Sequence, residues 1–264
     1  MKNKLVFFDI DGTLIDSLKG INAIPSSTIK SLKSLNKKGH RSFIATGRCE
    51  SFIVDSVLAY PFDGFVTCNG GYVSYQGECI IKHPIPLKAM EVAIEFARIN
   101  NTILYLESSE KIYVVNGHKL EHLDFERIWQ MKHSIQVHDF NVENIETYIG
   151  MMLMNDESEF PLLYQTLSPY FDVQRHPNQL SFDLTLKNVS KAVGIKSLVD
   201  KLGYNLEDVF AFGDGNNDLE MIELVGCGIA MGNAVETLKN IANYITTDID
   251  NAGIEKALIK YGLI

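Results

Sequence analysis

The sequence predicts an α/β fold in which a parallel sheet, covered by helices, is interrupted by a separate α+β unit. Three features of the 264-residue chain indicate this. Short apolar runs end in polar or glycine-rich turns, as strands buried on both faces of a parallel sheet do. Amphipathic segments with helix-start and helix-end residues separate these runs. Between about residues 83 and 186, paired strand-like runs flank polar turns, which indicates hairpins.

The predicted parallel strands are short and close at polar or small residues. The runs are Val6–Phe8, Phe43–Ala45, Phe65–Val66, Val209–Phe212 and a weaker one that closes at Ala230. In open α/β sheets, ligands bind outside the carboxyl ends of the strands. We therefore expect the polar residues that follow these strands to converge on one site, namely Asp9, Thr46, Asn69 and Asp214.

The segments between these strands carry apolar residues at helical spacing and end at glycine. We predict helices over Ser27–Lys38, Lys191–Leu202 and Asp218–Val225, each followed by glycine. A serine begins the first helix, as N-cap chemistry favours. These helices are expected to cover the faces of the parallel sheet.

The middle of the chain has the pattern of a separate α+β unit. Its predicted strands form two hairpins, Ile103–Leu106 with Ile112–Val115 and Phe171–Gln174 with Leu180–Leu184. Its predicted helices are Leu87–Ile99, Lys119–Met131 and Phe160–Leu167.

Composition and charge narrow the class of protein. The mean hydropathy of +0.01 and the 46% of hydrophobic residues are those of an ordered globular chain. A net charge of −9 disfavours nucleic acid or an anionic membrane as the main partner, so a phosphorylated ligand would need local positive charge. No apolar run approaches the roughly 20 residues of a membrane span, and the four cysteines show no CxxC spacing. We expect a cytoplasmic protein with reduced thiols and no membrane partner.

Two clusters of acidic residues follow predicted strands. Asp9 and Asp11 precede Gly12-Thr13, and they repel each other unless one is neutral or a cation lies between them. The second cluster is Gly213–Asp218, about two hundred residues later. Because Mg²⁺ favours a few carboxylates completed by water and phosphate oxygens, the two clusters together predict a Mg²⁺ site. Either segment alone is also compatible with an ordinary Asp-rich turn.

Two other metal sites are disfavoured by the same spacing rules. An EF-hand calcium loop starting at Asp214 would need glycine where Leu219 stands and a glutamate where Val225 stands. The pattern His118-Lys-Leu-Glu-His122 matches that of some zinc peptidases, but no second metal-binding motif accompanies it.

Two further segments offer phosphate-binding chemistry. Thr46-Gly47-Arg48 follows a strand, where a hydroxyl and backbone N–H groups can hold a phosphoryl oxygen. Lys191 begins a predicted helix and can neutralise phosphate as a point cation. Each segment is by itself a common turn or helix start.

Taken in order, these four segments resemble the motifs of the haloacid dehalogenase-like (HAD) superfamily. The matching segments are Asp9–Thr13, Thr46–Arg48, Lys191 and Gly213–Asp218, and the resemblance covers effectively the whole chain. The insertion between the second and third motifs is similar to the α/β cap of the Cof-like branch. The resemblance implies a Rossmann-like core formed by residues 1–83 and 187–264, with an inserted α+β cap domain at 84–186.

The resemblance also implies roles for individual residues. Asp9 would be the nucleophile that forms an aspartyl-phosphate, and Asp11 the general acid and base. The Asp9 side chain, the Asp11 carbonyl and Asp214 would hold Mg²⁺, and Asp218 would support a water bound to the metal or Lys191. The implied phosphoryl-binding groups are Thr46, the N–H groups of Ile10 and Gly47, Lys191 and Asn217.

The implied activity is Mg²⁺-dependent hydrolysis of small phosphorylated metabolites, with sugar phosphates as candidates. The cap would set specificity and exclude water from the intermediate. Two alternatives stay open. A phosphomutase or phosphotransferase would use the same nucleophile and pass the phosphoryl group to a second hydroxyl. A non-catalytic sensor of a phosphorylated ligand would keep the fold without turnover.

Overall fold

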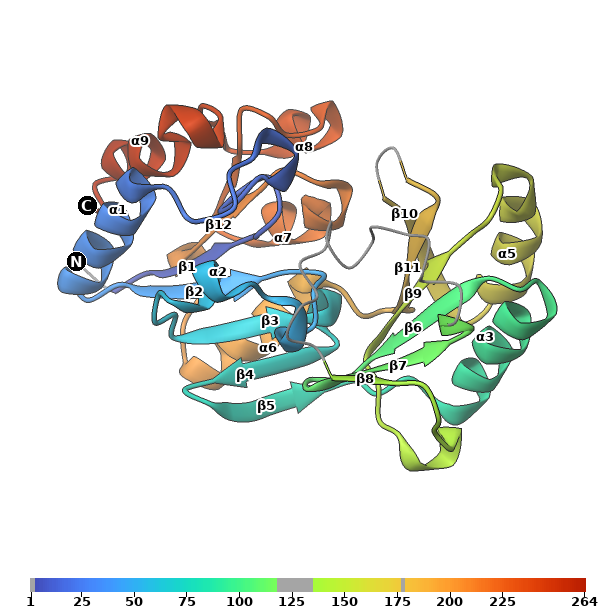
Figure 1. The fold of residues 1–264 in the computed structure, drawn as a ribbon. Helices are drawn as coiled ribbons and strands as arrows, with labels where there is room; N and C mark the ends of the chain where they lie inside the picture. Colours follow the sequence, from blue (N-terminus) through green and yellow to red (C-terminus); the bar gives the residue numbers. More distant parts are fainter. Residues whose placement is uncertain (1–2, 118–134, 177–178) are drawn as a thin grey trace. The chain divides into compact units, whose positions relative to one another are not determined.

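A computed structural model describes residues 3–117, 135–176 and 179–264 (Figure 1). The chain forms two compact units. The first consists of Met1–Gly47, Ile53–Ile81 and Ser190–Ile264, and the second of Arg48–Phe52 and Lys82–Val189. The short segment Arg48–Phe52 thus groups with the inserted unit although it follows the second strand of the first, which no sequence pattern indicated.

The first unit is built on an eight-stranded sheet with the order β14-β13-β12-β1-β2-β3-β4-β5. Its strands are β1 (Leu5–Phe8), β2 (Arg41–Ala45), β3 (Gly64–Thr67), β4 (Tyr72–Tyr75), β5 (Glu78–Lys82), β12 (Val209–Gly213), β13 (Cys227–Ala230) and β14 (Tyr244–Ile245). Neighbours from β14 through β3 are parallel, and β4 runs antiparallel to β3. All five predicted parallel strands are confirmed, with small shifts of their ends.

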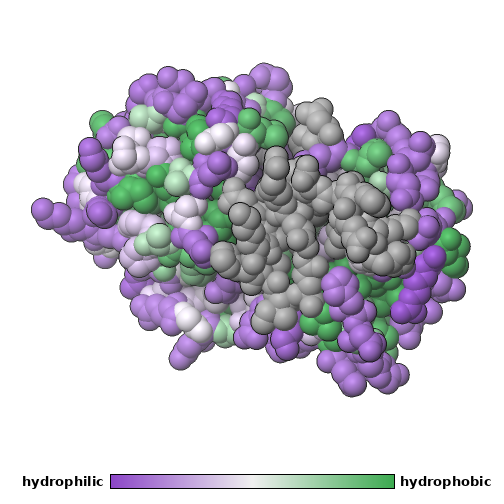
Figure 2. Space-filling view, viewed as in Figure 1, coloured by the Kyte–Doolittle hydropathy of each residue, from purple (hydrophilic) through white to green (hydrophobic). Residues whose placement is uncertain are grey.

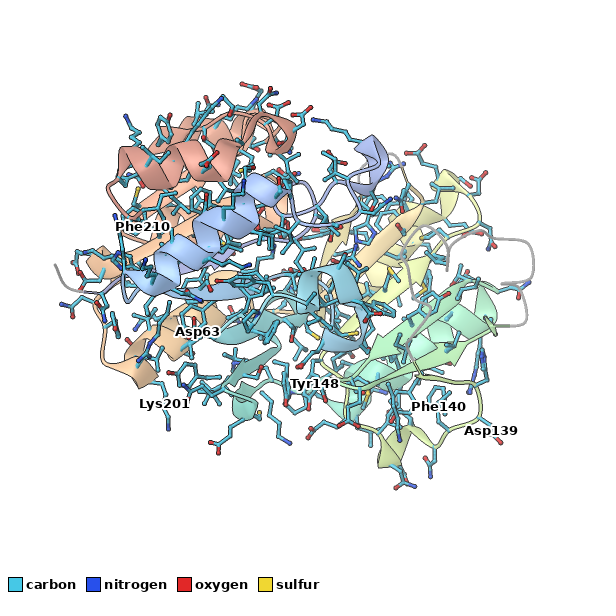
Figure 3. All side chains as sticks on the ribbon, turned by 60° about the vertical axis from the view of Figure 1, so that its left-hand side comes forward. Asp63, Asp139, Phe140, Tyr148, Lys201 and Phe210 are labelled. Carbon is cyan, nitrogen blue, oxygen red and sulfur yellow. The ribbon has the colours of Figure 1, made fainter. Side chains whose placement is uncertain are left out.

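Helices cover both faces of this sheet. They are α1 (Ser26–Lys37), α2 (Asp55–Leu58), α6 (Lys191–Leu202), α7 (Leu219–Leu224), α8 (Glu236–Ile241) and α9 (Gly253–Lys260). Side chains of α1 and α9 pack with Val6 and Phe8 of β1 on one face. Phe210 (Figure 3) belongs to this face and lies against Tyr261, with ring centroids 5.5 Å apart. Side chains of α6, α7 and α8 pack with Leu5 and Phe7 on the other face.

The helix ends show which sequence signals were decisive. Helix α6 spans Lys191–Leu202 as predicted, because the Ser190 hydroxyl accepts a hydrogen bond from the Val193 N–H and Gly203 ends the helix in a left-handed conformation. The predicted serine cap of α1 is wrong, since the helix starts one residue earlier, directly after Pro25, and no side chain caps it. Pro25 holds the N-cap position with a ψ of 146°, and its carbonyl accepts a helical hydrogen bond from the Ile29 N–H at 3.0 Å.

The second unit contains a six-stranded sheet with the order β10-β11-β9-β6-β7-β8. Its strands are β6 (Ile103–Glu107), β7 (Lys111–Val115), β8 (Ile135–Val137), β9 (Ile149–Leu153), β10 (Phe171–Arg175) and β11 (Ser181–Leu186). The pairs β6–β7 and β10–β11 are antiparallel, so both predicted hairpins are confirmed. Helices α3 (Leu87–Ile99) and α5 (Phe160–Leu167) have their predicted bounds. The predicted helix Lys119–Met131 lies outside the described residues.

The two faces of the second sheet differ in polarity. Leu104 and Leu106 of β6 pack in a cluster with α3 and α5. Because side chains alternate along a strand, Tyr105 and Glu107 belong to the opposite face, and both are buried. Asp183, on β11, shares this second face with them, as the pairing through β9 shows.

On the face shown in Figure 2, the coloured surface is mostly hydrophilic, with apolar residues among the hydrophilic ones. The exposed large apolar side chains, such as Leu18 and Ile99, are spread over several elements, including pairs on α3 (Leu87 and Ile99) and α5 (Leu162 and Tyr164). Among the described helices, none has the length and apolar character that crossing a bilayer requires.

Candidate active site

The strand order brings the predicted site residues to one edge of the first sheet. Strands β12, β1, β2 and β3 are consecutive neighbours and parallel, so their carboxyl ends lie at the same edge. Asp9 follows β1 directly, and its N–H donates to the Phe212 carbonyl of β12 at 3.0 Å. Thr46 follows β2 and is buried, while Asp214 follows β12. The expected convergence is therefore built by sheet topology.

Three carboxylates at this edge lie around one buried ammonium group. Oxygen atoms of Asp9, Asp214 and Asp218 all lie within 4.8 Å of one another. The Lys191 Nζ donates to Asp9 Oδ1 at 2.6 Å and to Asp218 Oδ1 at 2.7 Å. The Lys191 residue is only 1% exposed, so the first turn of α6 delivers this charge into the interior. One ammonium does not balance three carboxylates, which leaves the cluster short of positive charge.

The pKa values reflect this shortage. Burial raises the pKa of Asp9 to about 7, with Lys191 opposing the shift and the negative charges of Asp218 and Asp11 adding to it. Burial also raises the pKa of Asp214 to about 9, with further contributions from Asp9 and Asp218. Burial acts to lower the pKa of Lys191, but Asp218 and Asp9 outweigh it and raise that pKa, so the lysine stays charged. A divalent cation would offset the excess negative charge.

The donor set fits Mg²⁺ held by Asp9 and Asp214. Both oxygens of Asp218 already accept protein hydrogen bonds, one from Lys191 and the other from the N–H groups of Asp214 at 2.8 Å and Gly215 at 2.9 Å. Asp218 is therefore suited to orient the loop and the lysine. Asp9 and Asp214 offer hard oxygen ligands of the kind that Mg²⁺ selects, and the backbone carbonyl of Asp11 belongs to the same loop as Asp9.

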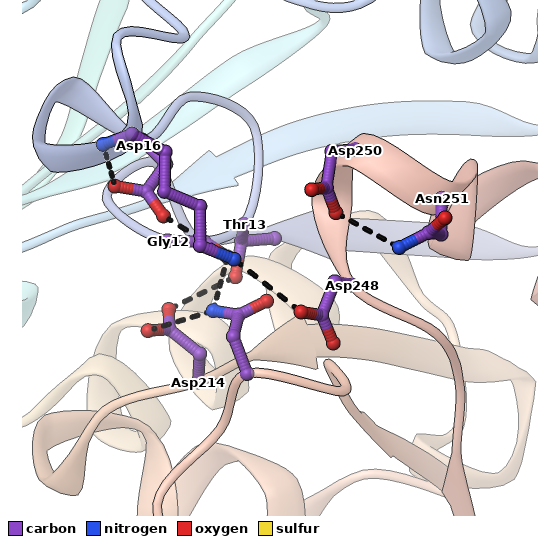
Figure 4. A network of polar contacts seen from close by, with 9 residues as sticks. Gly12, Thr13, Asp16, Asp214, Asp248, Asp250 and Asn251 are labelled. Carbon is purple, nitrogen blue, oxygen red and sulfur yellow. Dashed lines mark hydrogen bonds and ion pairs between the residues drawn. The ribbon is translucent and has the colours of Figure 1, made fainter.

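Gly12 makes room for Asp214. Its φ angle is +84°, which favours glycine, and a Cβ atom there would lie 2.1 Å from Asp214 Oδ2. The tight loop is held by the Gly12 N–H, which donates to the Ile15 carbonyl at 2.7 Å, and by the Leu14 N–H, which donates to the Ile10 carbonyl at 2.9 Å. Figure 4 shows the adjoining Thr13 hydroxyl, which donates to Asp214 Oδ1 at 3.2 Å.

The predicted phosphoryl-binding residues fall into two groups. Lys191 lies inside the carboxylate cluster. Asn217 lies beside Asn69, with its Nδ2 donating to Asn69 Oδ1 at 3.3 Å, and Gly47 also borders Asn69. The Asn69 N–H in turn donates to the Thr46 carbonyl at 3.0 Å. Asn69 therefore links the loops after β2, β3 and β12.

Asp11 belongs to neither of these two groups. The Asp11 side chain is exposed and is not one of the three clustered carboxylates, although it follows Asp9 by two residues. His118 and His122 of the zinc-like pattern lie outside the described residues.

Three residues of interest were not assigned a role from the sequence. Asn69 was expected at the converging strand ends, and its left-handed φ of 50° marks a specialised turn. Asn233 follows β13, and its Nδ2 donates to the Gly12 carbonyl at 2.9 Å. Its position just past a buried strand end, after Met231-Gly232, was the available signal. Glu107 of the second unit is buried at the end of β6, whereas the sequence placed it in the polar turn after the predicted strand Ile103–Leu106.

Comparison with known proteins agrees with this geometry. The family model for haloacid dehalogenase-like hydrolases matches residues 6–258. The protein named "Putative phosphatase YkrA" of Bacillus subtilis is 36% identical over 267 residues, which cover 100% of both chains. The structure of the HAD subclass IIB sugar phosphatase BT4131 has a TM-score of 0.85 at 30% identity and covers 99% of this chain and 100% of its own. A Geobacillus kaustophilus protein structure has a TM-score of 0.82 at 34% identity, with 99% and 100% coverage. The chain therefore belongs to the haloacid dehalogenase-like hydrolases.

Proposed function

We propose that this protein is a Mg²⁺-dependent phosphomonoesterase that hydrolyses small phosphorylated metabolites through an aspartyl-phosphate on Asp9. The observation that carries the proposal is the buried cluster in which Lys191 bridges Asp9 and Asp218 beside Asp214. A single carboxylate at the end of β1 is thereby held in a fixed orientation next to a permanent positive charge. Such a group suits in-line attack on phosphorus.

In the first step, an Asp9 carboxylate oxygen forms a bond to phosphorus while the bond from phosphorus to the leaving oxygen breaks. Asp11 gives its proton to that oxygen, so the substrate leaves as an alcohol. The exposed Asp11 side chain belongs to the same short loop as Asp9, which allows it to act on the opposite side of the phosphorus from the nucleophile.

In the second step, water attacks the phosphorus of the aspartyl-phosphate and the bond to Asp9 breaks. Asp11, now a carboxylate, takes the proton from the attacking water, so it ends the cycle protonated again. Inorganic phosphate leaves, and Asp9 is restored as a carboxylate. The same residue pair therefore serves both halves of the reaction.

The remaining residues bind charge. Lys191 neutralises phosphoryl oxygens near Asp9, and the Thr46 hydroxyl, the Gly47 N–H and Asn217 supply neutral donors. Asp9, Asp214 and the Asp11 carbonyl would hold Mg²⁺, which would supply positive charge to offset repulsion between the phosphate and the carboxylates. Asp218 keeps Lys191 in place through the 2.7 Å contact.

We assign the choice of substrate to the inserted unit, predicted as the cap at residues 84–186. Sugar phosphates are the first class to test, because the similar structure BT4131 is that of a sugar phosphatase. The net charge of −9 argues against nucleic acid as a substrate, since a polyanion would be repelled.

The direct experiment is phosphate release from a panel of sugar phosphates, nucleotides and coenzyme phosphates, with Mg²⁺ and with EDTA. Asp9→Asn serves as the control, because an amide is a poor nucleophile and a weak Mg²⁺ ligand. Release that needs both Mg²⁺ and Asp9 supports the proposal. An isomerised substrate without free phosphate would indicate a mutase, and ligand binding without any turnover would indicate a sensor.

A further inference from the structure

We propose that Asn233 is a positioning residue that orients the carboxylate of Asp214 for binding a divalent cation. This inference rests on the metal dependence in the proposed function. It concerns a residue outside the four segments on which the family resemblance depends, on a turn that follows β13.

The Asn233 amide connects two loops of the site. Its Nδ2 donates to the Gly12 carbonyl at 2.9 Å and lies 3.5 Å from Asp214 Oδ2. An amide NH₂ carries two hydrogens, so one group can serve both acceptors. The Gly12 carbonyl can only accept a hydrogen bond, so the donor end of the amide must face it. Figure 4 shows these contacts as dashed lines at the Gly12 carbonyl and the Asp214 carboxylate.

The turn that carries Asn233 is itself fixed to the Asp214 loop. The Met231 N–H donates to the Gly213 carbonyl at 3.0 Å, and the Val235 N–H donates to the Asp214 carbonyl at 2.9 Å. Backbone bonds on both sides of Asn233 therefore hold it at a set distance from Asp214. A side chain anchored in this way can restrict the rotamer of its neighbour.

Asp214 is thereby approached by neutral donors at both oxygens, Thr13 at Oδ1 and Asn233 at Oδ2. Neutral donors orient a carboxylate without cancelling its charge, whereas a lysine would compete with the cation. Each oxygen keeps lone pairs for a metal. This is the arrangement by which supporting residues tune a metal ligand.

The oxygen atom of the Asn233 amide gives a second indication that a hydrated metal ion binds here. Asn233 Oδ1 is a buried atom without a hydrogen-bond partner among the described residues. Buried acceptors normally accept at least one hydrogen bond, so we expect a donor to lie beside this oxygen atom. Mg²⁺ usually keeps several bound waters, whose O–H groups are such donors.

The test is Mg²⁺ binding measured by isothermal titration calorimetry on EDTA-treated and dialysed protein, without substrate. Asn233→Leu keeps similar size and removes both the donor and the acceptor. We expect its Kd for Mg²⁺ to rise by about tenfold or more. Asn251→Leu is the matched control, since Asn251 Nδ2 contacts Asp250 at 3.1 Å on an exposed turn, and the Kd of this variant for Mg²⁺ should stay at the wild-type value.

A kinetic measurement separates positioning from general damage. In Asn233→Leu, the Mg²⁺ concentration for half-maximal activity should rise in step with the Kd, while the substrate KM at saturating Mg²⁺ stays unchanged. An unchanged Kd for Mg²⁺, or a raised KM with normal Mg²⁺ dependence, would overturn the inference. Wild-type protein that binds no Mg²⁺ would instead defeat the metal dependence itself, and the inference with it.

A folding check completes the design. Thermal unfolding in EDTA shows whether each variant is folded, and Asn233→Ala is the second variant. If neither folds, a crystal structure of the wild type with Mg²⁺ decides the question. Asn233 Nδ2 within hydrogen-bond distance of Asp214, with Oδ1 accepting from a metal-bound water, supports the inference, and an amide turned away from Asp214 overturns it.

Discussion

The contribution of Lys191 to the free energy of unfolding depends on its buried environment. Its ammonium is buried between Asp9 and Asp218. We predict that Lys191→Met lowers the free energy of unfolding by about 3–5 kcal/mol near neutral pH, because it leaves buried carboxylates without their partner. Turnover should be lost as well. Urea unfolding followed by circular dichroism measures the first effect.

A matched lysine on the same helix provides the control. Lys196 pairs with Asp200 at 2.6 Å, but both side chains are more than half exposed. Lys196→Met should therefore change the free energy of unfolding by no more than about 1 kcal/mol. Equal losses for the two variants would contradict the role given to burial.

Glu107 is the buried acid of the second unit. Burial raises its pKa to about 8, and the negative charge of Asp183 adds to the shift, while hydrogen bonding to Cys49 opposes it. The ordinary value is 4.5, so the folded state binds a proton that the unfolded state releases between about pH 4.5 and pH 8. This contribution to stability is therefore complete below about pH 4.5 and is lost as the pH rises to about 8.

Glu107→Gln should remove this pH dependence. Glutamine is close in shape to the protonated acid and does not ionise, so the variant should gain stability relative to wild type as the pH rises. Each unit of pKa shift corresponds to about 1.4 kcal/mol. Chemical unfolding at pH 5 and pH 9 measures the difference, with the exposed Glu143→Gln as control. A constant difference between variant and wild type across that range would contradict the assignment.

At the scale of elements, the loop after β1 depends on one glycine. We predict that Gly12→Ala abolishes Mg²⁺ binding and activity, because the added Cβ would overlap the Asp214 carboxylate. Gly20→Ala is a close control in the neighbouring turn, with a similar φ of +73° and nothing within 4 Å of the added Cβ. It should cost about 1–2 kcal/mol of stability through backbone strain and leave Mg²⁺ binding intact. Isothermal titration with Mg²⁺ compares the two, and equal effects would count against the steric explanation.

Elements whose signals are local could be predicted from the sequence. Helix α6 has both a serine cap and a terminal glycine, and its bounds are as predicted. The parallel strands were recognisable because strands buried on both faces are apolar throughout. By contrast, β5 (Glu78–Lys82) was not predicted, since it is half-exposed and its residues do not form an apolar run.

The site residues that lie in local motifs could be predicted from the sequence, and those that depend on tertiary contacts could not. Asp9, Lys191 and Asp214 stand in dense motifs next to strand or helix ends, so their convergence follows from topology. Asn233 depends on hydrogen bonds between three separate loops, which no local pattern specifies. The burial of Glu107 likewise arises from tertiary packing, because an acid at the end of a strand is more often exposed.

For the molecule as a whole, we expect bound metal to contribute to the free energy of unfolding. Because three carboxylates surround one ammonium, Mg²⁺ should bind the folded state and stabilise it by about 2.7 kcal/mol at a concentration of 100 times its Kd. Thermal unfolding with increasing Mg²⁺ measures this, with NaCl of equal ionic strength as control. Asp214→Asn should lose most of the effect. Equal stabilisation by NaCl would point to general screening of the −9 net charge instead.

In the proposed reaction, Asp9 carries the phosphoryl group between two steps that both use Asp11. The most direct measurement is a rapid-quench experiment on Asp11→Asn with p-nitrophenyl phosphate, whose leaving group needs no proton from the enzyme. We expect a burst of p-nitrophenol close to one equivalent of enzyme, followed by slow turnover, with one phosphoryl group found on the peptide containing Asp9 by mass spectrometry. A linear release without a burst, and an unmodified Asp9 peptide, would rule out an aspartyl-phosphate on Asp9.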